Sequence, residues 1–153
     1  MLRVFTDSSY DNRYGIAGIG CVIIENQKRR VYSNWVKVSN NNIGELYALW
    51  FALNIIQGKD AEIYTDSTTA LSYIADEIKE KPLTPQRLKN RIELKKWGYR
   101  IRQITSPLTT FQHVKAHTNF CDEKYQQQSL ADALAKEGVK KFFYSLKVKQ
   151  NQR

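Results

Sequence analysis

The sequence predicts an α/β fold: one domain built on a five-stranded mixed sheet, with helices on both faces. Three runs rich in apolar and β-branched residues open the chain, and two more lie between later stretches with helical periodicity. The order along the chain is therefore β-β-β-α-β-α-α-β-α, which packs helices against a central sheet. With 153 residues, 42% of them hydrophobic, the chain is long enough to bury one core.

The first three elements are expected to be strands of an antiparallel meander. Residues 2–9 run through apolar and β-branched residues to a carboxylate, Asp7, at the end of the strand. Residues 16–24 are apolar and contain two glycines, as expected of a buried strand. A tight turn at 26–28 then leads into a third strand over 30–38.

The clearest helix is predicted over residues 43–56. The asparagines at 40–42 end the preceding strand and cap the helix, and Gly58 closes it. The core-facing stripe of this helix consists of Leu46, Leu49, Leu53 and Ile56.

The middle of the chain is expected to form one strand and two helices. Residues 61–65 form the fourth strand, and the chain continues through Asp66 and Ser67 into a second helix. The first and fourth strands thus both run into Thr-Asp-Ser, and if they pair in parallel, Asp7 and Asp66 lie side by side at one edge of the sheet. Thr84 followed by Pro85 predicts the start of a third, very basic helix that runs to about Gln103.

The last third of the chain is expected to hold the fifth strand over 109–114 and a polar loop over 118–128. A final helix is predicted to start near Ser129. We assign residues 1–144 to the domain and expect 145–153 to be a frayed, basic tail.

The net charge of +9 favours a polyanionic partner, although an excess of positive charge can also serve solubility alone. The two cysteines, Cys21 and Cys121, follow no zinc or disulfide spacing, so we expect free thiols in a reducing, cytoplasmic location. No run approaches the ~18 apolar residues of a membrane span, and because strand residues follow Met1 directly we expect no signal peptide. We therefore expect no membrane partner, and a monomer.

Four acidic residues stand out by their predicted positions, two at strand ends and two in the first turns of helices: Asp7, Glu45, Asp66 and Asp132. All four places can face one crevice of an α/β sheet. Four carboxylates suit two Mg²⁺ ions, with Mn²⁺ as a substitute, and such a pair can cleave a phosphodiester. Their mutual repulsion should raise their pKa values in the absence of metal. Taken singly, each also has a structural explanation, such as a helix cap or a favourable charge near a helix start.

Five short segments, in this order and on these elements, resemble type 1 ribonuclease H. The resemblance extends over residues 3–141. The segments are 5–9 (Phe-Thr-Asp-Ser-Ser), 41–46 (Asn-Asn-Ile-Gly-Glu-Leu), 64–67 (Tyr-Thr-Asp-Ser), 114–117 (Val-Lys-Ala-His) and 130–135 (Leu-Ala-Asp-Ala-Leu-Ala).

The resemblance implies a ribonuclease H-like fold and hydrolysis of the RNA strand of RNA–DNA hybrids, leaving 5′-phosphate and 3′-hydroxyl ends. It implies that Asp7 bridges two metal ions, that Asp132 shares the ion that activates water, and that Glu45 and Asp66 hold the other. His117 takes the place of a loop histidine that assists proton transfer or product departure.

The resemblance also implies substrate contacts. Asn41 and Asn42 match a pair that touches RNA 2′-hydroxyls, and an amide can both donate to and accept from a hydroxyl. As helix caps, however, they would need no ligand. Ser8 stands beside the substrate where the family usually has glycine, and the third helix would either track phosphates of the DNA strand or form a solvated face.

The sequence departs from the family pattern in places. Gln128 replaces a customary asparagine four residues before Asp132, and the stretch between His117 and Asp132 is longer than usual. Two alternatives therefore stay open: a nuclease of the same fold that acts on another nucleic acid, such as branched DNA, or a non-catalytic nucleic-acid-binding module.

Overall fold

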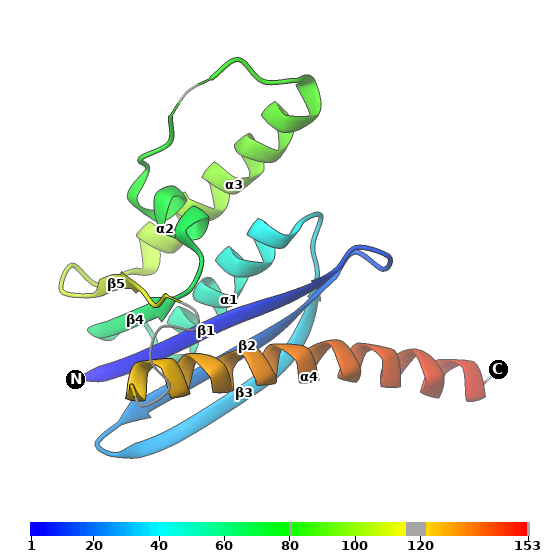
Figure 1. The fold of residues 1–153 in the computed structure, drawn as a ribbon, viewed down its shortest axis with the longest axis horizontal. Coiled ribbons are helices and arrows are strands. Elements are labelled where there is room, and N and C mark those ends of the chain that lie inside the picture. Colours follow the sequence, from blue (N-terminus) through cyan, green and yellow to red (C-terminus); the bar gives the residue numbers. More distant parts are fainter. Residues whose placement is uncertain (80, 116–121, 153) are drawn as a thin grey trace.

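A computed structural model of the chain describes residues 1–79, 81–115 and 122–152. It contains one five-stranded sheet in the order β3-β2-β1-β4-β5 (Figure 1). Strands β1, β2 and β3 pair antiparallel, whereas β1, β4 and β5 pair parallel. The predicted fold class and element order are thus confirmed. The strands are β1 (Leu2–Asp11), β2 (Ile16–Glu25), β3 (Lys28–Lys37), β4 (Ala61–Thr65) and β5 (Thr110–His113), and the helices are α1 (Asn41–Ile55), α2 (Thr68–Ala75), α3 (Pro85–Ile104) and α4 (Glu123–Asn151).

Local signals explain most of the element boundaries. Asn26 and Gln27 both have positive φ, as the tight two-residue turn between β2 and β3 requires, so β3 begins directly after them. The side chain of Asn40 accepts a hydrogen bond from the Ile43 amide (2.9 Å) and caps α1. Thr84 caps α3 and Pro85 occupies its first turn, as predicted.

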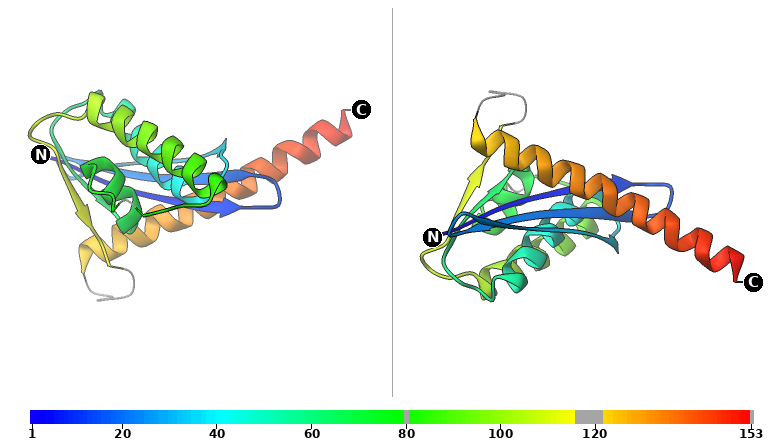
Figure 2. Two further views of the ribbon diagram at one scale, coloured as in Figure 1. Left: turned by 90° about the horizontal axis from the view of Figure 1, so that it is seen from above. Right: turned by 90° about the horizontal axis from the view of Figure 1, so that it is seen from below.

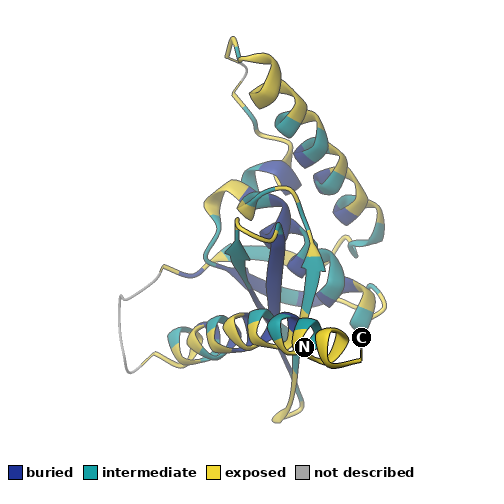
Figure 3. Ribbon diagram, turned by 90° about the vertical axis from the view of Figure 1, so that its right-hand side faces the viewer, coloured by how far each residue is buried: buried dark blue, intermediate teal, exposed yellow. Residues whose placement is uncertain are grey.

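Helices cover both faces of the sheet. Figure 2 shows α4 on one side and α1 with α3 on the other. On the α1 side, Leu46, Leu49 and Leu53 are fully buried against the sheet, and each such leucine contributes about 1.5–3 kcal/mol of burial free energy. The outer flanks of α3 and α4 stay exposed (Figure 3). No described helix combines the length and apolarity that a membrane span requires.

Helix α4 lies unusually close to the sheet because glycines face it. A Cβ atom placed on Gly20 would lie 1.9 Å from the Ala131 carbonyl oxygen, and one on Gly18 would lie 1.9 Å from the Ala135 carbonyl oxygen. No real side chain tolerates such a distance, so these two β2 residues must be glycine for α4 to pack here.

Two of the predicted positions of the acids within their elements were wrong. Strand β1 continues to Asp11, so Asp7 lies inside the strand and not at its end. Helix α1 begins at Asn41, which places Glu45 in the second turn. In both cases the element is longer at one end than the apolar pattern indicates.

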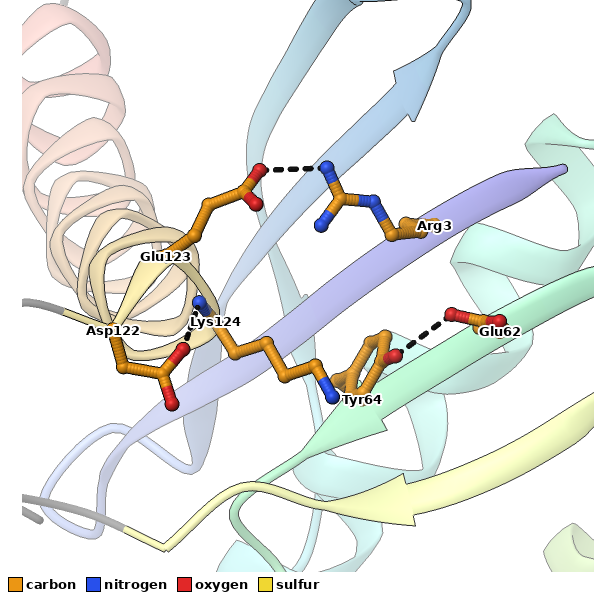
Figure 4. Close-up of polar contacts among 6 residues, drawn as sticks. All are labelled: Arg3, Glu62, Tyr64, Asp122, Glu123 and Lys124. Carbon is orange, nitrogen blue, oxygen red and sulfur yellow. Dashed lines mark hydrogen bonds and ion pairs between the residues drawn. The ribbon is translucent and has the colours of Figure 1, made fainter. Parts of the chain in front are cut away.

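The predicted start of the last helix was also wrong. Helix α4 begins at Glu123 instead of near Ser129, so Asp132 lies in its third turn. Figure 4 shows the contacts that fix this early start: Glu123 pairs with Arg3 of β1 (2.6 Å), and the Lys124 ammonium lies over the Tyr64 ring of β4 (5.2 Å). The Asp122 side chain caps the helix by accepting from the Lys124 amide (2.9 Å).

The C-terminal segment differs from the predicted frayed tail. Residues 145–151 continue α4 as helix. The reason lies just before them, where the Phe142 ring packs edge-on against Trp35 (5.0 Å) and Tyr14 (5.5 Å). These contacts hold α4 against the rest of the fold as far as Phe142, and the helix continues from there.

Candidate active site

Strands β1 and β4 bring two carboxylates to one edge of the sheet. The last parallel pair joins Phe5 to Tyr64, and β4 then ends at Thr65. Beyond that point β1 pairs only with β2, so Asp7, opposite Gly20, has an open side toward Asp66. The expectation that the two Thr-Asp-Ser segments lie side by side is confirmed.

Helix α1 adds a third carboxylate from one face of the sheet. Gly44 lets the helix approach β1, since a Cβ atom there would lie 2.5 Å from the Ser8 hydroxyl oxygen. Glu45 is consequently buried, with 6% of its surface exposed. One carboxylate oxygen each from Asp7, Glu45 and Asp66 lie within 4.8 Å of one another.

Asp132 approaches the same edge from α4, on the opposite face. It is half-exposed, and one of its oxygens lies 3.0 Å from the Lys136 ammonium. It nevertheless interacts with Asp7: a hydrogen bond and charge repulsion between the two side chains both raise the pKa of Asp7. Asp66 and Asp132 both line a pocket of about 270 Å³. The structure therefore brings all four predicted acids to one site.

Gln128 ties α4 to the strand that carries Asp7. Its side-chain amide donates a 2.7 Å hydrogen bond to the Thr6 carbonyl oxygen, and the residue is buried. The sequence pattern showed only that Gln128 departs from a customary asparagine. In the structure the longer side chain reaches the backbone of β1 next to Asp7.

Burial and mutual repulsion raise the pKa values of the clustered acids. Desolvation, followed by the charge of Asp66, raises the pKa of Asp7 to about 8. Burial raises the pKa of Glu45 well above its ordinary value, and the Asp7 charge adds to this effect. The pKa of Asp66 is raised as well, mainly by burial. The raised values predicted from the sequence are thus found for these three residues.

The residues at this site fit a divalent cation. Glu45 Oε2 is buried and has no hydrogen-bond partner among the described residues, which is costly for a carboxylate oxygen without a ligand. The donors are carboxylate oxygens alone, the ligands that Mg²⁺ and Mn²⁺ prefer. A bound cation would satisfy the oxygen and cancel the repulsion within the cluster.

The predicted substrate contacts lie near this cluster on α1 and β1. Asn41 is exposed and Asn42 half-exposed in the first turn of α1, whereas Asn40 alone serves as the cap. Neither of these two side chains forms a hydrogen bond within the described part of the chain. The Ser8 hydroxyl oxygen is buried beside Gly44, so this side chain does not offer the predicted substrate contact in the structure.

Of the two histidines, the structure describes only His113. His117 lies outside the described residues. His113 ends β5 with its Nε2 3.2 Å from the Asp66 carbonyl oxygen. Its charge also lowers the pKa of Asp66, against the larger effect of burial. The parallel pairing of Thr65 with His113 brings the two together, which no local sequence signal reveals.

The raised pKa values predict that metal-free protein becomes more stable as the pH falls from 8 to 5. Over this range the folded protein holds protons on Asp7 and Glu45 that the unfolded chain has released, because unfolded Asp and Glu titrate near 3.8 and 4.5. We expect a gain of about 1–3 kcal/mol in the free energy of unfolding. Urea unfolding in EDTA at several pH values measures it. A stability that is flat or falls toward pH 5 would contradict the prediction.

Comparison with known proteins agrees with this fold and site. Residues 1–140 match the model of the family described as RNase H. A search of curated protein sequences returned no significant match.

Solved structures share the fold at low sequence identity. LC11-RNase H1, isolated from compost by a metagenomic approach, is 23% identical, with a TM-score of 0.69 over 93% of this chain and 97% of the other. RNase H1 from the archaeon Halobacterium salinarum is 19% identical, with a TM-score of 0.69 over 92% and 98%. LC11-RNase H1 in complex with an RNA/DNA hybrid is 22% identical, with a TM-score of 0.65 over 94% and 99%.

The family match spans the sheet and every acid of the cluster. The chain therefore belongs to the RNase H family, and it is a ribonuclease H, an endonuclease for the RNA strand of RNA–DNA hybrids.

Proposed function

We propose that Asp7, Glu45, Asp66 and Asp132 hold two divalent metal ions, Mg²⁺ or its substitute Mn²⁺, and that hydrolysis at this site leaves 5′-phosphate and 3′-hydroxyl ends. The observation that carries the proposal is the cluster of Asp7, Glu45 and Asp66, of which the first two are buried, with its unpartnered Glu45 oxygen. Such a cluster destabilises the protein unless a cation offsets it.

The position of each acid suggests its role. Asp7 clusters with Glu45 and Asp66 and also interacts with the more exposed Asp132, and for this reason we assign it to both ions. Asp132 lines the open pocket, where water and the scissile phosphate have access. When bound, a pair of divalent ions activates a water molecule and stabilises charge on the leaving oxygen. We assign proton transfer or product departure to His117, because histidine as a residue type can exchange a proton near neutral pH.

The substrate side of the proposal rests on α1 and on the overall charge. Asn40 supplies the helix cap, so the amides of Asn41 and Asn42 are available to a ribose 2′-hydroxyl, the group that distinguishes RNA from DNA. LC11-RNase H1 has been solved with an RNA/DNA hybrid, which supports the same partner here. The basic helix α3 is proposed to contact phosphates of the DNA strand.

We also propose that the enzyme acts as a monomer in the cytoplasm. Burial raises the pKa of the Cys21 thiol to about 12, so this cysteine is a core residue and not a reactive or disulfide-forming one. Size-exclusion chromatography with light scattering tests the monomer.

A cleavage assay on end-labelled substrates tests the proposed function. We expect Mg²⁺-dependent cleavage of the RNA strand in an RNA–DNA hybrid, with no cleavage of duplex DNA, duplex RNA or a branched DNA junction. End-group analysis should find 5′-phosphates. Junction cleavage without hybrid cleavage would identify a nuclease of another specificity, and hybrid binding without cleavage would identify a non-catalytic module.

Mg²⁺ is expected to raise the melting temperature of the protein. At concentrations well above its dissociation constant, an ion that binds only the folded state adds about 1–3 kcal/mol, or about 2–12 °C for a chain of this size. Calorimetry with 10 mM MgCl₂ against NaCl of equal ionic strength measures the shift. The variant Asp7→Asn should show a smaller rise, and an equal rise in both proteins would place the bound ion elsewhere.

A further inference from the structure

One flank of α4 carries a row of exposed lysines. We define the α4 ridge as Lys136, Lys140 and Lys147, which are exposed along the helix. With 3.6 residues per turn, positions separated by four and eleven residues fall within about 40° of each other around the helix axis. The three side chains therefore leave the helix on the same side.

The α4 ridge lies on the flank that borders the active-site pocket. Four pocket-lining residues come from this flank: Tyr125, Ser129, Asp132 and Lys136. Asp132 reaches Asp7 from here. Lys140 and Lys147 therefore continue, away from the pocket, the row that starts at the cluster of acids.

Helix α4 also extends past the part of the chain that matches the family. The match ends at residue 140, whereas the helix continues to Asn151. In Figure 1 its C-terminal end reaches beyond the turn that connects β1 and β2. Phe142 holds the helix in this direction through Trp35, and the Lys141 ammonium donates to the Ser33 carbonyl oxygen (2.8 Å). No acidic residue follows Glu137, so this end of the chain is purely basic.

We propose that Lys140 and Lys147 bind backbone phosphates of the nucleic acid on one side of the cleavage site and so lengthen the footprint of the enzyme. Asp132 and Lys147 are separated by roughly 22 Å along the helix, at 1.5 Å per residue. That distance corresponds to about six or seven nucleotides at 3.4 Å per strand. The proposal rests on the proposed function, because it takes a duplex bound at the acids as its starting point.

Phosphates fit the α4 ridge better than a protein partner does. The row is continuous with the pocket at which we place the substrate phosphate, and its side chains offer positive charge. A second copy of the chain would bring the same positive charge to the interface. A polyanion is the partner that the charge and the continuity both favour.

The test uses hybrids in which a short block of ribonucleotides fixes the cleavage position. The flanking duplex is either short on both sides or lengthened by 10 base pairs on one side or the other. We compare Lys140→Gln and Lys147→Gln with Lys149→Gln, which removes the same charge from the same end of the helix but lies about 200° around the axis from Lys147. The measurement is kcat/KM as a function of salt concentration.

We expect wild type to gain about 3–10-fold in kcat/KM when one of the two flanks is lengthened, and Lys140→Gln and Lys147→Gln to lose part of that gain. Each should also lower the slope of log(kcat/KM) against log[salt] by about 1 on the long hybrid, with no change on the short one. Lys149→Gln should behave as wild type. Equal effects of Lys147→Gln and Lys149→Gln, or no gain with either flank, would overturn the proposal.

The two proposals fail separately. If wild type cleaves the short hybrid but the ridge variants match the control, the footprint is wrong and the proposed function stands. If wild type cleaves no hybrid, the proposed function fails. The footprint is then tested by anisotropy titrations, in which Lys147→Gln should bind the long hybrid more weakly than Lys149→Gln does.

Discussion

Asp7→Asn is expected to lower the rate of hybrid cleavage by at least about a thousandfold and, at the same time, to make the metal-free protein more stable. The rate loss corresponds to about 4 kcal/mol of transition-state stabilisation. It follows because Asp7 clusters with Glu45 and Asp66 and also interacts with Asp132, and the amide would replace the carboxylate proposed to serve both ions. The stability gain of about 1–3 kcal/mol follows because the neutral amide removes a charge that burial and Asp66 disfavour.

Two measurements separate catalysis from folding in this variant. Single-turnover cleavage of a labelled hybrid in Mg²⁺ gives the rate, and urea unfolding in EDTA at pH 8 gives the stability. Asp76→Asn is the matched control, because Asp76 caps the end of α2 in the left-handed region, which asparagine also tolerates. It should change neither quantity. Wild-type activity in Asp7→Asn would refute the mechanism, and a loss of stability would refute the account of repulsion within the cluster.

The elements that carry the acids could be predicted from the sequence, but their lengths could not. The Thr-Asp-Ser segments after apolar runs indicated two neighbouring strands, and β1 and β4 do pair in parallel. The predicted end of β1 was wrong because a strand continues as long as at least one neighbouring strand pairs with it. Strand β2 pairs with β1 as far as Asp11, whereas β4 stops at Thr65, so the open edge at Asp7 arises from the mismatch between two partners.

The start of α4 illustrates a different limit. Residues 123–128 are polar, and without an apolar stripe they gave no helical signal. Glutamine, lysine and glutamate are nevertheless good helix formers, so these residues can become helical. Contacts with residues distant in the sequence then determine where the helix begins. Arg3 and Tyr64, both far away in the sequence, hold the first turn. The convergence of Asp132 on Asp7 did not depend on this boundary, because the close packing of α4 on β2 fixes it.

Gly20→Ala is expected to destabilise the protein by about 2–3 kcal/mol and to lower cleavage by about a hundredfold under conditions in which it stays folded. The added Cβ atom would lie 1.9 Å from the Ala131 carbonyl oxygen and 2.7 Å from the Ala135 amide nitrogen, so α4 must move outward. Ala131 precedes Asp132, and Gly20 pairs with Asp7, so this movement separates the two acids. A displacement of about 1 Å at reacting groups can cost a hundredfold in rate. Urea unfolding and single-turnover cleavage measure both effects.

Gly15→Ala shows whether the effect comes from the packing of α4 or from the loss of a glycine as such. Gly15 has a φ of 62° in the turn between β1 and β2, and a Cβ atom there would meet nothing closer than the Val38 carbonyl oxygen at 3.6 Å. The alanine in Gly15→Ala would be strained only because it must adopt the left-handed conformation, which costs about 1–2 kcal/mol of stability. Cleavage by this variant should be unchanged. Should Gly20→Ala cleave hybrids as fast as Gly15→Ala, the spacing between α4 and β2 would not govern the site, and the contribution of Asp132 to catalysis would have to be independent of its distance from Asp7.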